Sequence, residues 1–156
     1  MIAEFDKRDV KLIALTPDSV DAAKVWSKEI TKLATTTKAI PIIADKSRSI
    51  SLLYDMLDPA EKAKGTVSTV RDIFIIDPER KVRLIFSYPH NVGASVQEVL
   101  RVVDSLQTPD SVSTPAGWVP GQQVLVGPDA EADRDMAVQD ATAIAKGVVL
   151  GTVEGV

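Results

Sequence analysis

The stretch that decides the fold is residues 70–88, VRDIFIIDPERKVRLIFSY. Two apolar runs rich in Ile, Val and Phe flank DPERK at 77–81, a group of charged and turn-forming residues. Short apolar runs of this composition predict strands. A connection of about five residues between them predicts an antiparallel hairpin. We therefore expect strands over 70–77 and 82–88, joined by a tight turn.

Two strand and helix pairs precede this hairpin. Residues 10–15, VKLIAL, form an apolar run typical of a strand buried on both faces of a parallel sheet. A helix is expected over 20–33, because apolar residues recur there every three or four positions. That stripe consists of Val20, Ala23, Trp26, Ile30 and Leu33. A second short strand is expected over 41–45 and a short helix over 49–57.

A second long helix follows the hairpin, beginning after Val92. Its apolar stripe consists of Val96, Val99, Leu100, Val103 and Leu106. Residues 108–115 have the Pro, Ser, Thr and Asp composition of a linker. Beyond them we expect a turn and short strand over 117–126 and a helix over 131–146.

A hairpin followed by a helix, after strand and helix pairs, indicates an α/β protein of the thioredoxin-like class. A flavodoxin-like sheet is the alternative that periodicity leaves open. The change of composition after Gln107 divides the chain into a core domain, 1–107, and a C-terminal region, 108–156.

The composition excludes several functions. The chain has 156 residues, no cysteine and one histidine, so it offers no disulfide, thiolate or multi-histidine metal site. A net charge of −4 argues against non-specific nucleic-acid binding. No apolar run is long enough for a transmembrane helix, and the charged first residues are unlike a signal peptide. We therefore expect a cytoplasmic location.

Ordered stretches of the chain resemble one family, the 1-Cys peroxiredoxins of the peroxiredoxin-6 type. The resemblance covers residues 5–126, and the chain departs from the family after 126. The matching stretches are RDVKLIAL (8–15), DSV (18–20), WSKEI (26–30), PIIAD (41–45), MLDP (56–59), KG (64–65), TVR (69–71), YP (88–89), EVLRVVDSLQ (98–107), TP (114–115), GW (117–118) and PG (120–121).

The resemblance implies a thioredoxin-like peroxiredoxin core lacking its first strands and its active-site helix, followed by a C-terminal tail domain. The family's Pro-x-x-x-Thr-x-x-Cys segment would precede residue 8, and no such segment occurs in this sequence. The histidine that accompanies the cysteine in this subfamily would also lie in that segment.

The activity implied is thiol-dependent reduction of hydrogen peroxide and organic or lipid hydroperoxides, with an external thiol as reductant. No metal or organic cofactor is implied. Because these residues hold no nucleophile, we expect them to be inactive alone. The resemblance implies a homodimer, or a heterodimer with a full-length peroxiredoxin. The alternative function is therefore a non-catalytic module that pairs with such a full-length relative.

Arg71 is the candidate catalytic residue, because it matches the family arginine that stabilises the thiolate and binds peroxide oxygens. Without the resemblance, Arg71 would be a charged residue at a strand start, held by a carboxylate such as Asp72. Ala94 stands where the family commonly has a second arginine. Glu79 stands where the subfamily's lipase site usually has Asp, so we expect no lipase activity.

Other chemically distinctive residues receive structural interpretations. We expect His90 to face solvent in a loop, Trp26 to lie in the core, and Trp118 to anchor the tail on its own domain or on a partner. Glu131, Asp133 and Asp135 lack the glycine and glutamate spacing of a calcium loop, so we interpret them as a solvated helix start.

The absence of the family's central strand has a physical consequence. In the family that strand lies between the counterparts of residues 10–15 and 70–77. Each buried backbone group left unpaired would cost about 1–3 kcal/mol, against a net stability of about 5–15 kcal/mol. Three outcomes are open: the flanking strands pair with each other, another chain supplies the strand, or the chain is only marginally stable.

Overall fold

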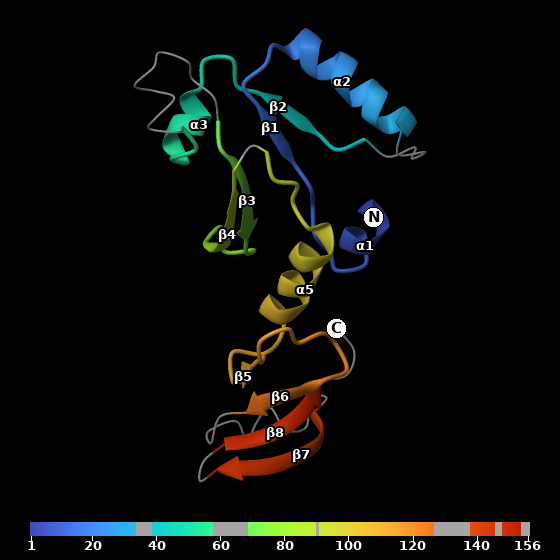
Figure 1. Ribbon diagram of the computed structural model, residues 1–156, viewed down its shortest axis with the longest axis vertical. Coiled ribbons are helices and arrows are strands. Elements are labelled where there is room, and N and C mark those ends of the chain that lie inside the picture. The colour runs from blue at the N-terminus through green and yellow to red at the C-terminus, as the bar shows by residue number, and fades with distance from the viewer. Residues whose placement is uncertain (34–38, 58–68, 90, 127–137, 146–147, 154–156) are drawn as a thin grey trace. The chain divides into compact units, whose positions relative to one another are not determined.

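The computed structural model describes residues 1–33, 39–57, 69–89, 91–126, 138–145 and 148–153 (Figure 1). The chain divides into two compact units, Met1–Ala94 and Ser95–Val156. The long helix after the hairpin therefore groups with the C-terminal region. The predicted boundary between a core domain, 1–107, and a C-terminal region, 108–156, refers to the domains of the family and stays a prediction. Among the described residues, no helix is both long and apolar enough to cross a membrane.

The first unit begins with α1 (Ile2–Asp6), a short helix that the sequence pattern did not predict. It is followed by β1 (Ala14–Thr16), α2 (Val20–Leu33) and β2 (Ile42–Ala44). The two strands pair in parallel, and α2 lies alongside them (Figure 1). The predicted helix has the bounds observed, whereas the strand predicted over 10–15 is observed only over Ala14–Thr16.

The hairpin is confirmed as β3 (Arg71–Ile76) and β4 (Val82–Tyr88), which pair antiparallel. The helix α3 (Ser49–Leu53) precedes it and is shorter than the predicted 49–57. This helix ends early because Asp55 adopts a left-handed backbone conformation, with φ of 54°, which an α-helix cannot contain.

The strands that would flank the missing central strand do not pair with each other. In the described part of the chain, β1 pairs with β2 and β3 with β4, as separate two-stranded sheets. The expectation that residues 10–15 are buried on both faces is therefore wrong, since Ile13 is 67% exposed. Trp26, expected in the core, is 53% exposed, because a two-stranded sheet is too narrow to cover the apolar face of α2.

The described residues of the second unit form a helix and a four-stranded antiparallel sheet. Helix α5 (Val96–Leu106) precedes β5 (Val112–Ser113), β6 (Gln123–Val126), β7 (Val138–Ala145) and β8 (Val148–Val153). The strand order is β5-β6-β8-β7. The helix predicted over 131–146 is wrong for the described residues 138–145, because pairing with β8 overrides the helix propensity of this alanine-containing segment. Glu131, Asp133, Asp135 and His90 lie outside the described residues.

The core of the second unit forms around Trp118. Its side chain is 1% exposed and clusters with Val124 and Val126, against which Val112 packs. The expectation that Trp118 anchors the tail is confirmed, and the anchor lies within its own unit. On α5, the buried apolar residues are Val99, Val102 and Val103.

Candidate functional site

Arg71 begins β3 and is exposed. Its guanidinium Nη1 donates a hydrogen bond to the backbone carbonyl of Val92, in the loop that follows β4. This contact ties the side chain to residues distant in sequence and limits the directions in which the guanidinium can point. The strand start and the loop after the hairpin together position the arginine.

The geometry does not support the alternative interpretation, in which the carboxylate of Asp72 holds the guanidinium of Arg71. Neighbouring residues of a strand project to opposite faces of the sheet, so Asp72 is turned away from the guanidinium. Its buried Oδ1 atom has no hydrogen-bond partner. The observed partner of Arg71 is a neutral carbonyl, which leaves the positive charge of the guanidinium uncompensated by that contact.

Aromatic side chains flank both faces of the hairpin near this arginine. Tyr88 lies directly opposite Arg71 in the strand register, so the two residues share a face. The ring of Tyr88 stacks with that of Phe86, with centroids 6.3 Å apart. On the other face, Phe74 contacts Tyr54 edge to face at 5.1 Å.

Asp45 is a buried carboxylate that the sequence analysis did not single out as a site. It is 3% exposed, and its Oδ2 atom accepts hydrogen bonds from the backbone N–H of Ser51 at 2.8 Å and from its hydroxyl at 2.9 Å. Burial raises the pKa of Asp45, but the hydrogen bonds from Ser51, Ile50 and Ser49 together outweigh burial and lower the pKa. Asp45 is therefore a fixed anion that stabilises α3, not a proton donor.

The positions where the chain departs from its expected family pattern are also described. Ala94 is half-buried at the end of the loop after the hairpin, and its methyl group adds no charge beside Arg71. Glu79 is exposed in the turn between β3 and β4. Within the described ranges, no three acidic or histidine side chains come together in a way that could hold a metal ion.

The chemistry available at this site is anion and oxygen recognition. A guanidinium presents several fixed N–H donors and stays charged at every physiological pH. It can stabilise a thiolate or the oxygens of a bound peroxide. The 156 residues contain no cysteine that could act as the nucleophile.

Comparison with known proteins identifies the family. Residues 1–85 match the AhpC/TSA family. The chain is 44% identical over 141 residues to the mitochondrial peroxiredoxin PRX1 of Saccharomyces cerevisiae, covering 86% of this chain and 54% of that one. It is 48% identical over 132 residues to peroxiredoxin-6 of Rattus norvegicus, covering 80% and 59%. The chain thus spans a little more than half the length of these relatives.

Solved structures give the same result for the fold. The crystal structure of a variant of peroxiredoxin 6 from Arenicola marina matches 99% of this chain and 74% of its own, with a TM-score of 0.80 and 36% identity. A yeast mitochondrial 1-Cys peroxiredoxin matches 96% and 74%, also with a TM-score of 0.80 and 36% identity. The thioredoxin-like class expected from the element order is confirmed, and the chain belongs to the peroxiredoxins of the AhpC/TSA family, with relatives of the 1-Cys type.

Proposed function

We propose that these residues supply the arginine side of a thiol-dependent peroxidase site, with Arg71 as its catalytic arginine. The observation that carries the proposal is the exposed guanidinium held at the start of β3 by the carbonyl of Val92. The nucleophilic thiolate has to come from a cysteine outside the 156 residues. The match to relatives along only part of their length is consistent with this division.

The reaction proposed is the two-electron reduction of a hydroperoxide, ROOH. The thiolate sulfur attacks one peroxide oxygen, the O–O bond breaks, and the alcohol or water departs after taking up a proton. The sulfur is oxidised to sulfenic acid. One external thiol condenses with the sulfenic acid to a mixed disulfide and water, and a second external thiol releases the thiolate and leaves as a disulfide. Arg71 would lower the thiol pKa and donate hydrogen bonds to the peroxide oxygens.

Substrates and reductant follow from the family. We propose hydrogen peroxide and organic hydroperoxides, including those of lipids, as substrates. The yeast mitochondrial 1-Cys peroxiredoxin has its thiol resolved through glutathione and thioredoxin systems, and thiols of these classes are the reductants we propose here. The cytoplasmic location stays a prediction, since the yeast relative is a mitochondrial protein.

Peroxide consumption in the presence of a thiol reductant tests this proposal. We expect no turnover above the uncatalysed rate from the 156 residues alone. Joining the cysteine-bearing N-terminal segment of a peroxiredoxin 6 to this chain should restore activity. In that joined protein, Arg71→Gln should lower kcat/KM by about 10²–10³-fold.

The control is Arg83→Gln, which removes an exposed arginine of the same hairpin that pairs with Asp77 at 3.5 Å. This control should retain the activity of the joined protein. Turnover by the metal-free 156 residues would contradict the proposed inactivity. Full activity in the Arg71→Gln joined protein would contradict the proposed role of the arginine.

A second candidate function is a non-catalytic module that pairs with a full-length peroxiredoxin. The observation that favours it is β4, which, like β1, β2 and β3, pairs on one edge only among the described strands. Val82 and Ile85 of this strand are both about half exposed, and an exposed apolar edge strand favours pairing with another chain. A dimer with a full-length relative would bury this edge.

Co-expression with a tagged, cysteine-bearing peroxiredoxin 6 tests the pairing function. A stable one-to-one complex in size-exclusion chromatography with light scattering would support it. Ile85→Lys should abolish the complex, whereas Arg80→Lys, in the exposed turn, should leave it intact. Elution of the two proteins as separate species would reject this second function.

A further inference from the structure

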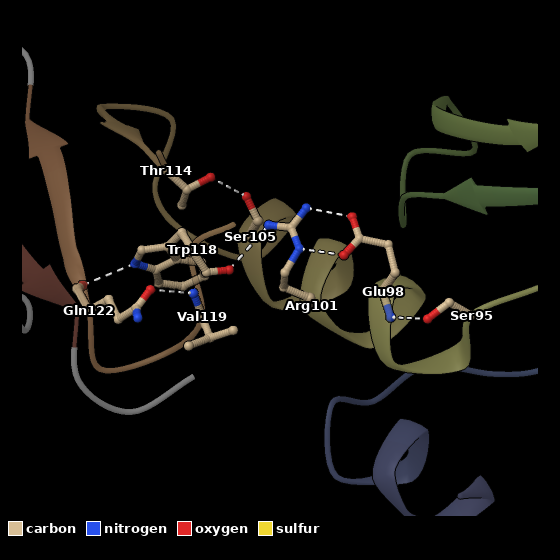
Figure 2. Close-up of polar contacts among 8 residues, drawn as sticks. All are labelled: Ser95, Glu98, Arg101, Ser105, Thr114, Trp118, Val119 and Gln122. Atoms are coloured by element: carbon tan, nitrogen blue, oxygen red, sulfur yellow. Dashed lines mark hydrogen bonds and ion pairs between the residues drawn. The ribbon is translucent and has the colours of Figure 1, made fainter. Parts of the chain in front are cut away.

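A short segment of the second unit folds onto α5 through a few specific polar contacts. We name residues 114–122 the strap (Figure 2). Two turns close the strap on itself, with the N–H of Trp118 donating to the carbonyl of Pro115 and that of Gln122 to the carbonyl of Val119. The indole Nε1 of Trp118 also donates to the carbonyl of Gln122 at 3.0 Å. The strap is therefore a compact local unit.

Polar contacts attach the strap to α5 at both its start and its middle. The hydroxyls of Ser105 and Thr114 lie 2.6 Å apart at one end. Near its middle, Nη1 of Arg101 donates to the carbonyl of Trp118 at 3.2 Å (Figure 2). Residues 111–126 contain no charged side chain, so Arg101 provides the charged group in this attachment.

Glu98 fixes the orientation of Arg101. The Nε and Nη2 atoms of Arg101 donate to the two carboxylate oxygens of Glu98, each at 2.7 Å. A planar guanidinium gripped on one edge in this bidentate way presents its remaining N–H groups in fixed directions. The Nη1 group that reaches Trp118 is one of these, so Glu98 acts on the strap through Arg101.

The sequence around Glu98 favours a different contact for its carboxylate. Ser95 and Glu98 have the spacing of a capping box, in which the glutamate reaches back to the backbone N–H of the serine. Half of this motif forms, since the N–H of Glu98 donates to Oγ of Ser95 at 3.3 Å. Both carboxylate oxygens instead accept hydrogen bonds from Arg101. The carboxylate of Glu98 therefore orients Arg101 toward the strap and does not cap α5.

We propose that the strap is an acid-opened latch, which Arg101 holds closed while Glu98 is ionised and which opens as a local unit when Glu98 is neutralised. Neutral Glu98 no longer attracts the guanidinium, which turns to solvent and leaves the carbonyl of Trp118 without its donor. Opening moves the indole of Trp118, which is 1% exposed, out of its cluster with Val124 and Val126.

The pH range follows from the charges near Glu98. The hydrogen bonds from Arg101 hold the pKa of Glu98 below its ordinary value of 4.5. The closed strap is therefore fully stabilised above pH 4.5, and the stabilisation is lost as the pH falls through the lowered pKa. The strap itself has no titratable group, and the other acidic residue of α5 is the buried Asp104.

Fluorescence of Trp118 tests the latch. The experiment uses a Trp26→Phe variant as the parent, so that all tryptophan fluorescence comes from Trp118. In Glu98→Gln at pH 7, the open-to-closed ratio of the strap, measured by acrylamide quenching of Trp118, should rise by up to about fivefold. The parent protein should show the same rise only below about pH 4.5. Arg101→Gln should match Glu98→Gln, and the double variant should add nothing further, because Glu98 acts through Arg101.

Two controls separate the latch from helix capping and from general charge loss. Ser95→Ala removes the cap but keeps the ion pair, so Trp118 should stay shielded at pH 7. Glu4→Gln neutralises a glutamate paired with Lys7 and Arg8 in the first unit, and should also leave Trp118 shielded. Shielding of Trp118 in Glu98→Gln equal to that of the parent would overturn the proposal. Exposure that occurs only together with loss of far-ultraviolet circular dichroism would also overturn it.

Discussion

At the scale of single residues, Asp45 shows how local hydrogen bonding makes a buried charge acceptable. A buried carboxylate is costly unless donors replace its lost water. Asp45 receives donors from the first turn of α3, where backbone N–H groups have no partner within the helix. The hydroxyls of Ser47 and Ser49 lie 3.4 Å from its other oxygen. The sequence DKSRSIS therefore specifies both the end of β2 and the start of α3.

Asp45→Asn should destabilise α3 at neutral pH, because the amide keeps one acceptor oxygen and places an NH₂ group among donors. The lowered pKa of Asp45 means that its ionised form stabilises the fold above its ordinary pKa of 3.8. That stabilisation is lost as the pH falls below this value. Hydrogen–deuterium exchange of peptides covering 49–53 should be faster in the variant at pH 7, and the difference from the parent should shrink as the pH falls below 3.8.

The matched control is Asp110→Asn, the same change at an exposed residue of the second unit. It should leave the exchange of residues 49–53 unchanged. Equal exchange rates for the Asp45 variant and its parent at pH 7 would show that the serine hydrogen bonds contribute nothing to α3.

At the scale of elements, the turn of the hairpin holds Arg80 in an unfavourable backbone conformation. The N–H of Arg80 donates to the carbonyl of Asp77 at 3.0 Å, which closes a β-turn. Oδ1 of Asp77 accepts from the N–H of Lys81 at 2.8 Å and reinforces it. Arg80 has a φ of 67°, a left-handed conformation in which a side chain with a Cβ atom is strained.

Arg80→Gly should therefore stabilise the hairpin by about 0.5–1 kcal/mol, because glycine adopts this conformation without a steric cost. Arg80→Val should destabilise it by about 1 kcal/mol or more. Chemical denaturation followed by circular dichroism measures both changes. Glu79→Gly is the control, and it should lower stability, because the φ of Glu79 is not positive. Stabilisation by both glycine variants would contradict this account of the turn.

At the scale of the whole molecule, many large apolar side chains among the described residues are exposed. Leu53 is 83% exposed and Ile13 67%. The described residues of the first unit form two separate two-stranded sheets, and such small sheets are marginally stable without further layers. Exposed apolar side chains on this scale favour association with other surfaces.

The purified 156 residues should therefore associate and unfold over a broad temperature range with low cooperativity. Light scattering and thermal scans at several protein concentrations measure both properties. Leu53→Lys should shift the population toward monomer without loss of secondary structure, because this side chain has little burial to lose. A sharp, concentration-independent thermal transition from a monodisperse monomer would contradict this prediction.

Much of the fold could be predicted from local patterns in the sequence. The stripe of α2, the two runs of the hairpin and the stripe of α5 each identify an element, because periodicity records which face is apolar. The family could also be identified from ordered short matches. The candidate site could be predicted only as a residue, Arg71, since its partner Val92 comes from a loop 21 positions away.

The sequence by itself determined the helices α2 and α5, the hairpin, the family resemblance and the absence of a cysteine nucleophile. Only the tertiary structure decided that β1 and β3 remain unpaired with each other, that Trp26 is exposed, and that residues 138–145 are a strand. These outcomes depend on which distant segments are available to pair or to cover a surface. Local propensity contains no information about such partners, because strand pairing and burial are properties of contacts between segments.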